Sequence, residues 1–209
     1  MGHAGAARDA HWNQVYSTKG ELDVSWFEAS PSTSIELLEA AGMNTRSCVL
    51  DVGGGDSHLV DVLLTRGLTC LAVLDVSGAA LARVQARLGD GAQVPVWIEA
   101  DVTSTWSLKP MDLWHDRAVF HFLTAPEDRA RYADRLFATL TPGGSAIIAT
   151  FALDGPERCS GLPVQRYSPE SLAAELGPRL RLVESRHHLH TTPWGRTQSF
   201  QYSWLRRVG

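Results

Sequence analysis

The sequence predicts an α/β fold: a three-layer sandwich in which helices cover both faces of a mostly parallel, seven-stranded sheet. From residue 47 onward, apolar runs typical of buried strands alternate with segments of helical periodicity. Three successive glycines, Gly53 to Gly55, join the first strand to a helical segment at 58–65. The last two strands are joined by the short segment 191–196, which requires antiparallel pairing. An antiparallel C-terminal hairpin should therefore close the parallel sheet.

Each expected element has its own signal in the chain. The seven strands are expected at 47–52, 70–75, 94–99, 111–116, 145–151, 180–190 and 198–206. A short helix that ends in glycine should precede them at 34–42. Ser77 can cap the helix after the second strand, and Pro126 and Ser168-Pro169 mark two further helix starts. These elements leave 152–167 as a long loop after the fifth strand.

Composition and charge restrict the class of protein. A net charge of −4 argues against broad nucleic-acid binding, and no apolar run is long enough to predict a membrane span. Three cysteines follow no spacing motif. We expect Cys48 and Cys70 to be buried thiols and Cys159, in a Gly/Pro-rich loop, to meet solvent. These features favour a cytoplasmic, reducing compartment and a monomer or homodimer that binds neither nucleic acid nor membranes.

The glycine corner predicts a site for a cofactor that carries a nucleoside. Glycines let the backbone take unusual angles and let a ligand approach the main chain closely. Asp75 follows Gly55 by twenty residues, at the end of the second strand, where a carboxylate suits the two hydroxyls of a ribose. A dinucleotide fingerprint would place a third glycine where His58 stands, which opposes NAD. An NAD-dependent oxidoreductase is accordingly the weaker alternative.

The pattern D-x-G-x-G at Asp51, Gly53 and Gly55 resembles motif I of the class I S-adenosylmethionine (SAM) methyltransferases. Later segments resemble the successive motifs of that family at fitting spacings: residues 74–77, 99–102, 112–114 and 140–144. The resemblance covers roughly residues 47–205 and implies SAM as the cofactor. It also implies a sheet that is closed by an antiparallel hairpin.

The same resemblance implies which residues hold SAM. The residues expected to border the methionine moiety are Asp51, Gly53, Gly54 and Gly55. The carboxylate of Asp75, with Val76 beside it, would take the ribose hydroxyls. Asp101 would contact the adenine amine with Val102 beside the ring. No metal is implied, because His188 and His190 share a strand face but no third ligand is evident.

Candidate catalytic residues lie where the fourth strand ends. His115, Asp116 and His121 are polar groups inside an otherwise apolar run, over the edge of the sheet where ligands bind. We expect His115 or Asp116 near the sulfonium or the acceptor, and His121 as a possible base. The alternative is that Asp116 pairs with Arg117 and that the histidines are satisfied packing residues.

The N-terminal segment is unusually aromatic. We expect residues 1–10 to be disordered and residues 1–30 to form a flexible segment with an aromatic lid, ahead of a methyltransferase domain at 31–209. Trp26 would close over the cofactor, with Tyr16 and Phe27 on the substrate side. A hydrophobic strap on the sheet edge is the alternative. The pattern H-W-x-x-x-Y is similar to a segment of some protein-lysine methyltransferases.

These observations predict a SAM-dependent methyltransferase acting on a small intracellular acceptor. Arg166 and Tyr167, in the loop after the fifth strand, are further candidates for binding the acceptor. A protein-lysine methyltransferase remains the alternative within the enzyme class. A non-catalytic SAM-binding regulator remains the alternative outside it.

Overall fold

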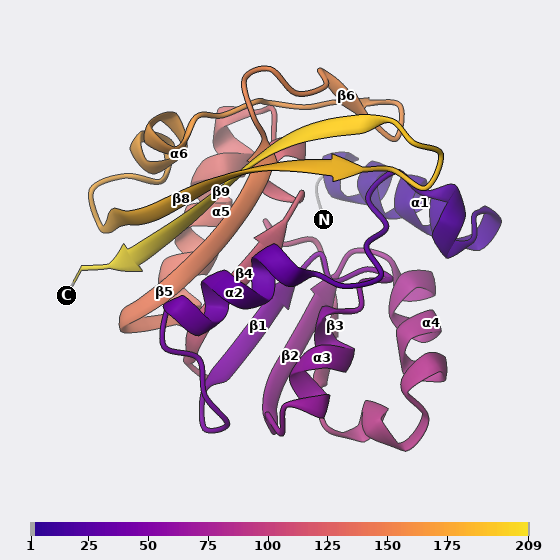
Figure 1. The fold of residues 1–209 in the computed structure, drawn as a ribbon, viewed down its shortest axis with the longest axis horizontal. Helices are drawn as coiled ribbons and strands as arrows, with labels where there is room; N and C mark the ends of the chain where they lie inside the picture. Colours follow the sequence, from indigo (N-terminus) through magenta and orange to yellow (C-terminus); the bar gives the residue numbers. More distant parts are fainter. Residues whose placement is uncertain (1–2, 209) are drawn as a thin grey trace.

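The computed structural model describes residues 3–208 and contains one seven-stranded sheet in the order β3-β2-β1-β4-β5-β9-β8 (Figure 1). Its strands are β1 Cys48–Val52, β2 Cys70–Asp75, β3 Val96–Glu99, β4 Met111–Arg117, β5 Leu140–Phe151, β8 Leu180–Thr191 and β9 Thr197–Arg207. The first five are parallel, whereas β9 runs antiparallel to both β5 and β8. The predicted fold class and its closing hairpin are therefore confirmed.

Helices cover both faces of this sheet. They are α1 His3–Thr18, α2 Ser32–Ala40, α3 Leu59–Thr65, α4 Gly78–Leu88, α5 Pro126–Thr139 and α6 Pro169–Leu176. Short 3-10 turns lie at Glu21–Asp23, Gly89–Gln93 and Phe120–Phe122. A small hairpin of β6 Arg158–Cys159 and β7 Leu162–Pro163 occupies the loop after β5, which the sequence predicted to lack structure.

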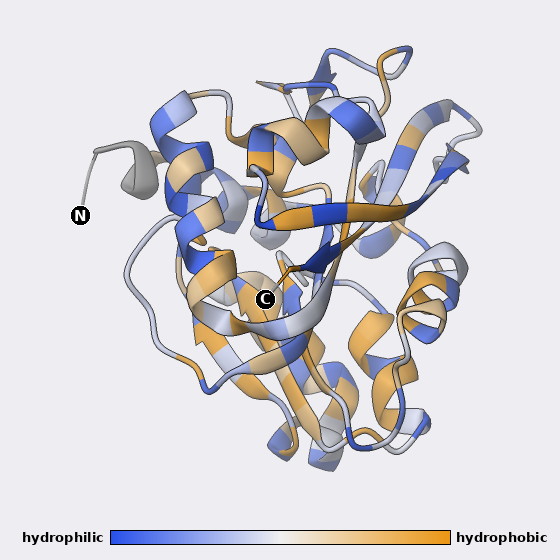
Figure 2. Ribbon diagram, turned by 90° about the vertical axis from the view of Figure 1, so that its left-hand side faces the viewer, coloured by the Kyte–Doolittle hydropathy of each residue, from blue (hydrophilic) through white to orange (hydrophobic). Residues whose placement is uncertain are grey.

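Two hydrophobic cores follow from the alternation of side chains along the strands. On one face, Leu50 and Trp114 pack with side chains of α5 and α6. On the other face, their neighbours Val49 and Leu113 pack with side chains of α2, α3 and α4. The strands at the centre of the sheet are correspondingly hydrophobic, while the helices alternate in hydropathy (Figure 2). This arrangement is the predicted three-layer sandwich.

The helix boundaries obey the capping signals in the sequence. The Ser77 hydroxyl accepts a hydrogen bond from the backbone N–H of Ala80 at 3.2 Å and begins α4. Pro126 and Pro169 occupy the first turns of α5 and α6, as expected. Gly177, with a φ of 87°, ends α6. The helices α5 and α6 both pack on the face of the sheet that carries Trp114.

Two elements differ from the prediction. Strand β5 begins at Leu140, five residues before the expected start, because Leu140 pairs with Met111 and the ladder shifts register before Leu113. The expectation of disorder over residues 1–10 is wrong for residues 3–10, which belong to α1; residues 1–2 lie outside the described residues. No apolar stripe of helical period marks this helix in the sequence, so it escapes pattern analysis.

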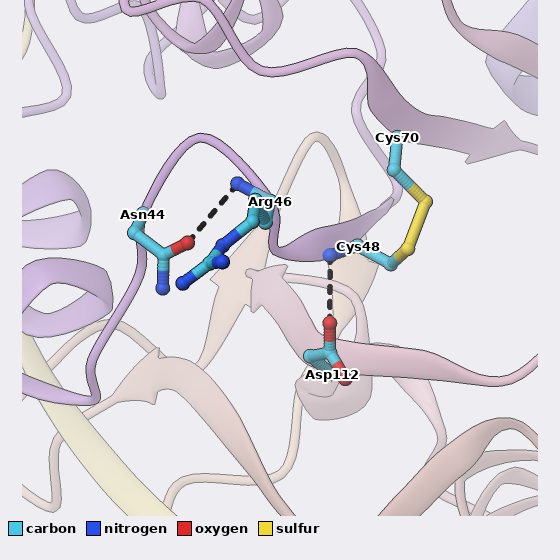
Figure 3. The surroundings of a disulfide bond; sticks show 5 residues. All are labelled: Asn44, Arg46, Cys48, Cys70 and Asp112. Carbon is cyan, nitrogen blue, oxygen red and sulfur yellow. Dashed lines mark hydrogen bonds between the residues drawn. A yellow bond between two sulfur atoms is a disulfide. The ribbon is translucent and has the colours of Figure 1, made fainter.

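The cysteines also differ from the prediction. Cys48 and Cys70 form a disulfide, because the register of β1 and β2 sets them side by side with a Cα–Cα distance of 4.6 Å (Figure 3). The backbone N–H of Cys48 also donates to Asp112 at 2.9 Å. Cys159, expected at the surface, is buried with 6% of its surface exposed, because the β6–β7 hairpin folds it inward.

Within residues 3–208, none of the helices is both long and apolar enough to cross a membrane.

Candidate functional site

The glycine corner forms the floor of the candidate site, at the carboxyl ends of β1 and β2. Gly53 has a φ of 64°, and a Cβ there would lie 1.9 Å from a methyl carbon of Val119. Gly55 has a φ of 49°, and its Cβ would lie 2.4 Å from the Tyr16 hydroxyl. Both positions therefore require glycine for conformation and for space. The absence of a Cβ at these two positions lets Val119 and Tyr16 pack directly against the backbone of the corner.

Asp75 ends β2 beside this corner and is 5% exposed. Its carboxylate accepts a hydrogen bond from the backbone N–H of Ser77 at 2.8 Å. Burial raises its pKa to about 7, and the nearby Asp51 adds to this effect, while backbone donors at Ser77 and Gly55 oppose it. Such a carboxylate gains from a ligand that donates hydrogen bonds, as two ribose hydroxyls do.

Asp51 forms a buried network with His115. Asp51 Oδ1 lies 2.7 Å from His115 Nδ1, and His115 Nε2 lies 2.9 Å from the hydroxyl of Ser34. The second carboxylate oxygen of Asp51 is buried and has no hydrogen-bond partner in the protein. It lies at a hollow that Gly53 and Gly54 also line. An unpartnered buried carboxylate oxygen is costly, so a cationic amine placed there would stabilise it.

Asp101 follows β3, on the same side of the cavity as Asp75, with Val102 beside it. Its carboxylate accepts hydrogen bonds from Thr103 and from Arg8 of α1, whose Nε is 2.8 Å from Oδ2. Arg8 also reaches Asp128 at 2.8 Å, at the start of α5. The ion pairs of Arg8 thus fasten α1 across the site.

An aromatic cluster covers the cavity between these carboxylates. The Trp12 ring centroid is 5.6 Å from Trp26 and 5.1 Å from Phe122, and Tyr16 is 6.2 Å from Trp26. The described cavity of about 100 Å³ is lined by Arg8, Trp12, Tyr16, Trp26, Gly53, Leu74, Asp75, Val76, Ala100, Asp101, Val102, Arg117, Ala118, Val119, Phe122, Leu123, Phe151, Cys159, Gln198 and Phe200. Sites that hold small molecules are roughly 300–1,000 Å³. Side chains of this cover must therefore move when a ligand enters.

Asp116 is buried and does not line the cavity. Its fully buried carboxylate accepts hydrogen bonds from the backbone N–H groups of Val119 and Phe120 and, at 2.6 Å, from the Tyr132 hydroxyl. Burial raises its pKa to about 6. These bonds hold a turn in which Ala118 has a left-handed φ of 75°. The geometry supports Asp116 as a positioning residue for this turn.

His121 is also fully buried, against Phe122 and Phe151. Its Nδ1 accepts a hydrogen bond from the backbone N–H of Phe151 at 3.3 Å, so the ring proton of the neutral form is on Nε2. Burial, reinforced by the charge of Arg117, lowers its pKa to about 3. With its lone pair already engaged, this imidazole is poorly arranged to act as a base.

The buried neutral state of His121 should make stability depend on pH. Its pKa is low in the folded chain and near 6.5 when unfolded, so folding excludes a proton that the unfolded chain binds below pH 6.5. When the pH falls from 6.5 to 5, the free energy of unfolding of the wild type should decrease by about 2 kcal/mol relative to that of His121→Gln. Urea unfolding of both proteins at the two pH values measures this difference. A constant difference would show that His121 is accessible and titrates normally.

Arg117 is the residue of this site that the sequence analysis undervalued. Its guanidinium does not pair with Asp116. It forms an ion pair with Glu28 at 2.9 Å and donates to the Trp26 carbonyl at 2.8 Å and to the Tyr202 hydroxyl at 3.0 Å. It therefore anchors the segment that carries Trp26, and it lines the cavity as well.

The residues expected to bind the acceptor lie in different places. Tyr16 lines the cavity next to the glycine corner, on the cofactor side. Phe27 packs edge-on against His58 and lines the neighbouring hollow that contains Asp51. Tyr167 is in the hydrophobic core, and Arg166 bonds to Gly155 and Glu157 within its own loop. The structure does not bring the last three to the cavity.

Other residues form the wall opposite the cofactor carboxylates: Phe122, Phe151, Gln198 and Phe200. Phe151 ends β5, and an antiparallel β9 brings its first residues, including Gln198, to the same edge of the sheet. The predicted hairpin already indicates that the start of β9 lies at the edge of the sheet where ligands bind. Only the observed pairing of β9 with β5 shows which of these side chains face the cavity.

The residues present fit a cofactor with a charged amine and a nucleoside. The orphaned oxygen of Asp51 suits the amine, the Gly53–Gly55 cradle admits a chain close to the backbone, and Asp75 suits a ribose. Val76, Val102 and the aromatic cover provide apolar walls for a base. SAM has all of these parts.

Comparisons with known proteins identify a methyltransferase domain in this chain. Residues 50–146 match a sequence family described as a methyltransferase domain. No curated protein sequence matches the chain. Three solved structures share the fold. A 1,6-didemethyltoxoflavin N1-methyltransferase of Burkholderia thailandensis, with S-adenosylhomocysteine bound, is 18% identical, with a TM-score of 0.72 over 100% of this chain and 91% of that one.

The second is the N-methyltransferase NodS of Bradyrhizobium japonicum with S-adenosylhomocysteine, at 18% identity and a TM-score of 0.70 over 95% of this chain and 100% of that one. The third is a SAM-dependent methyltransferase of Anabaena variabilis, at 13% identity and a TM-score of 0.74 over 99% and 96%. The family match spans the glycine corner, Asp75 and Asp101. Residues 50–146 therefore form a methyltransferase domain, and the chain shares the fold of these SAM-dependent methyltransferases.

Proposed function

We propose that this methyltransferase acts on a small, largely apolar acceptor, and that the accepting atom is a nitrogen or a thiolate sulfur. The observation that carries the proposal is the composition of the cavity wall opposite the cofactor carboxylates. This wall is made of three phenylalanines with one amide, Gln198, whose buried Oε1 has no hydrogen-bond partner. A planar or apolar molecule with one hydrogen-bond donor would complement it.

The enclosure of the cavity supports a small acceptor. Helix α1 crosses the site and is fastened to both Asp101 and Asp128 by Arg8. The aromatic rings of Trp12 and Trp26 close the same side. A polypeptide would need an open groove that leads to the methyl group, which these contacts block.

The chemistry of the lining supports nitrogen or thiolate as the nucleophile. In methyl transfer the acceptor lone pair forms a bond to the methyl carbon while the carbon–sulfur electrons return to sulfur, so the leaving group needs no acid. Among the described residues that line the cavity there is no histidine, and both acids, Asp75 and Asp101, belong to the cofactor side. Burial raises the pKa of the Cys159 thiol to about 11, so it stays protonated. The accepting atom must therefore have a lone pair that is free to react without removal of a proton by the enzyme.

The structural relatives add support of the same kind. One of them is named as an N1-methyltransferase of 1,6-didemethyltoxoflavin and another as an N-methyltransferase. A protein-lysine methyltransferase is the alternative, because the N-terminal aromatic pattern of this chain is similar to a segment of some of those enzymes. A non-catalytic SAM-binding protein is the second alternative.

Methyl-labelled SAM, incubated with the protein and a cell extract, should transfer label to small molecules that pass an ultrafiltration membrane and that chromatography then separates from unreacted SAM. The Asp75→Asn variant, which should bind SAM weakly, is the matched control. Label in the protein fraction would favour the lysine alternative. Intact SAM binding with label in neither fraction would favour a regulator.

A further inference from the structure

A cluster of Glu28, His188 and His190 lies outside the cofactor cavity. One ligand atom from each residue lies within 4.8 Å of the others. His188 and His190 share one face of β8, because strand side chains alternate, and β8 is the edge strand of the sheet. Glu28 comes from the segment between α1 and α2. The sequence revealed two of the three residues, and the third is distant along the chain.

Hydrogen bonds outside the cluster orient both rings. His190 Nε2 lies 2.7 Å from the carbonyl oxygen of Ser25, which can only accept, so Nε2 carries a proton. Its Nδ1 therefore faces Glu28 with a lone pair in the neutral ring. His188 Nδ1 lies 3.2 Å from the Thr33 hydroxyl, which turns Nε2 toward the same carboxylate. Metal-binding histidines are usually held in this way, through the nitrogen that does not bind the ion.

The distances within the cluster suit a shared ion better than direct hydrogen bonds. Glu28 Oε1 is 3.4 Å from His190 Nδ1 and 3.6 Å from His188 Nε2. Ordinary N–H···O bonds are about 2.7–3.2 Å long. Ligands that bind zinc tetrahedrally at about 2.0–2.1 Å lie about 3.4 Å from each other.

One cation of the protein already lies beside the carboxylate of this cluster. Arg117 competes as a cation, since its Nη2 is 2.9 Å from Glu28 Oε1. The affinity should therefore be roughly micromolar rather than that of a structural zinc.

We propose that Glu28, His188 and His190 form a three-ligand site for a divalent ion of the zinc type. Two imidazoles and one carboxylate are a ligand set that zinc accepts, with a further position left open. The cluster borders a hollow of about 740 Å³, which gives an ion and its fourth ligand a path from solvent. A bound ion would join the segment that carries Trp26 to the β8–β9 hairpin.

Titration of the tag-free, chelator-treated protein with Zn²⁺ tests the proposal by calorimetry. We expect one ion per chain and a higher melting temperature when it binds. Glu28→Gln and His188→Gln should each weaken the affinity at least about 10-fold, because loss of a residue that only supports a ligand already costs that much. Co²⁺ at the same site should show visible absorption that these variants lose.

His187→Gln is the matched control, because His187 lies on the opposite face of the same strand and contacts Ser199 at 2.7 Å. It should keep the wild-type affinity. Thermal melts without metal show whether each variant is folded. If His188→Gln does not fold, Glu28→Gln, whose position lies outside the sheet, still tests the proposal. Absence of stoichiometric binding, or equal affinity in wild type and folded Glu28→Gln, would overturn the proposal and leave an ion pair of Glu28 with protonated histidines.

Discussion

Replacing Asp75 with asparagine is expected to stabilise the protein near neutral pH and to weaken SAM binding. The folded protein holds the proton of Asp75 up to a pKa of about 7, whereas the unfolded chain releases it near 3.8. Stability that is present below pH 3.8 is therefore lost as the pH rises to 7. Asparagine does not titrate, so its stability relative to wild type should rise by about 2–3 kcal/mol between pH 5 and pH 7.

Urea unfolding of both proteins at the two pH values measures the change without assuming equal hydrogen bonding in the variant. SAM affinity should fall by about 10- to 100-fold, because the ribose loses charge-assisted hydrogen bonds. Asp154, an exposed carboxylate that does not line the cavity and accepts a hydrogen bond from Ser199, provides the control substitution Asp154→Asn. A parallel pH dependence in wild type and Asp75→Asn would mean that Asp75 is ionised in the folded protein throughout this range.

Removal of residues 1–18 should leave the sheet folded and reduce SAM affinity at least about 100-fold, or about 2.7 kcal/mol. Helix α1 supplies Trp12 and Tyr16 to the cavity and Arg8 to Asp101. It contributes no strand to the sheet, and the two hydrophobic cores are built from the elements after it. The expected loss therefore concerns the ligand more than the fold.

Binding titrations and thermal melts on the truncated protein separate a lid from a structural strap. Trp12→Ala should reproduce part of the loss, whereas Gln14→Ala, at an exposed position of the same helix, should not. Undiminished affinity per folded molecule together with a much lower melting temperature would show that α1 is a strap.

Much of the fold could be predicted because its signals are local. Buried strands, the cap at Ser77 and the proline at position 126 each act within one turn or one strand, and all appear in the structure. The early start of β5 depends on pairing with Met111, and α1 depends on contacts with distant residues. Pairing and tertiary contact leave little trace in local sequence, so these were missed.

The site divides along the same line. Asp51, Asp75 and the glycines are fixed by their places at strand ends. The structure places Asp75 at the cavity and Asp51 at the neighbouring hollow, and Gly53 lines both. The polar run after β4 predicted function, but the partners of Asp116 and His121 proved to be Tyr132 and backbone groups. Polar residues in an apolar run need partners, and sequence does not say whether a ligand or the protein provides them.

The disulfide has a consequence for the cost of ordering the cofactor site. Its two cysteines are 22 residues apart, and the loop that they close contains Gly53, Gly54 and Gly55. Glycine loses more conformational entropy on folding than any other residue. A cross-link over such a loop limits the unfolded chain by about 3 kcal/mol in the chain-entropy account. The disulfide thus lowers the conformational entropy of the unfolded chain around the glycines, so less entropy is lost when the cradle becomes ordered on folding.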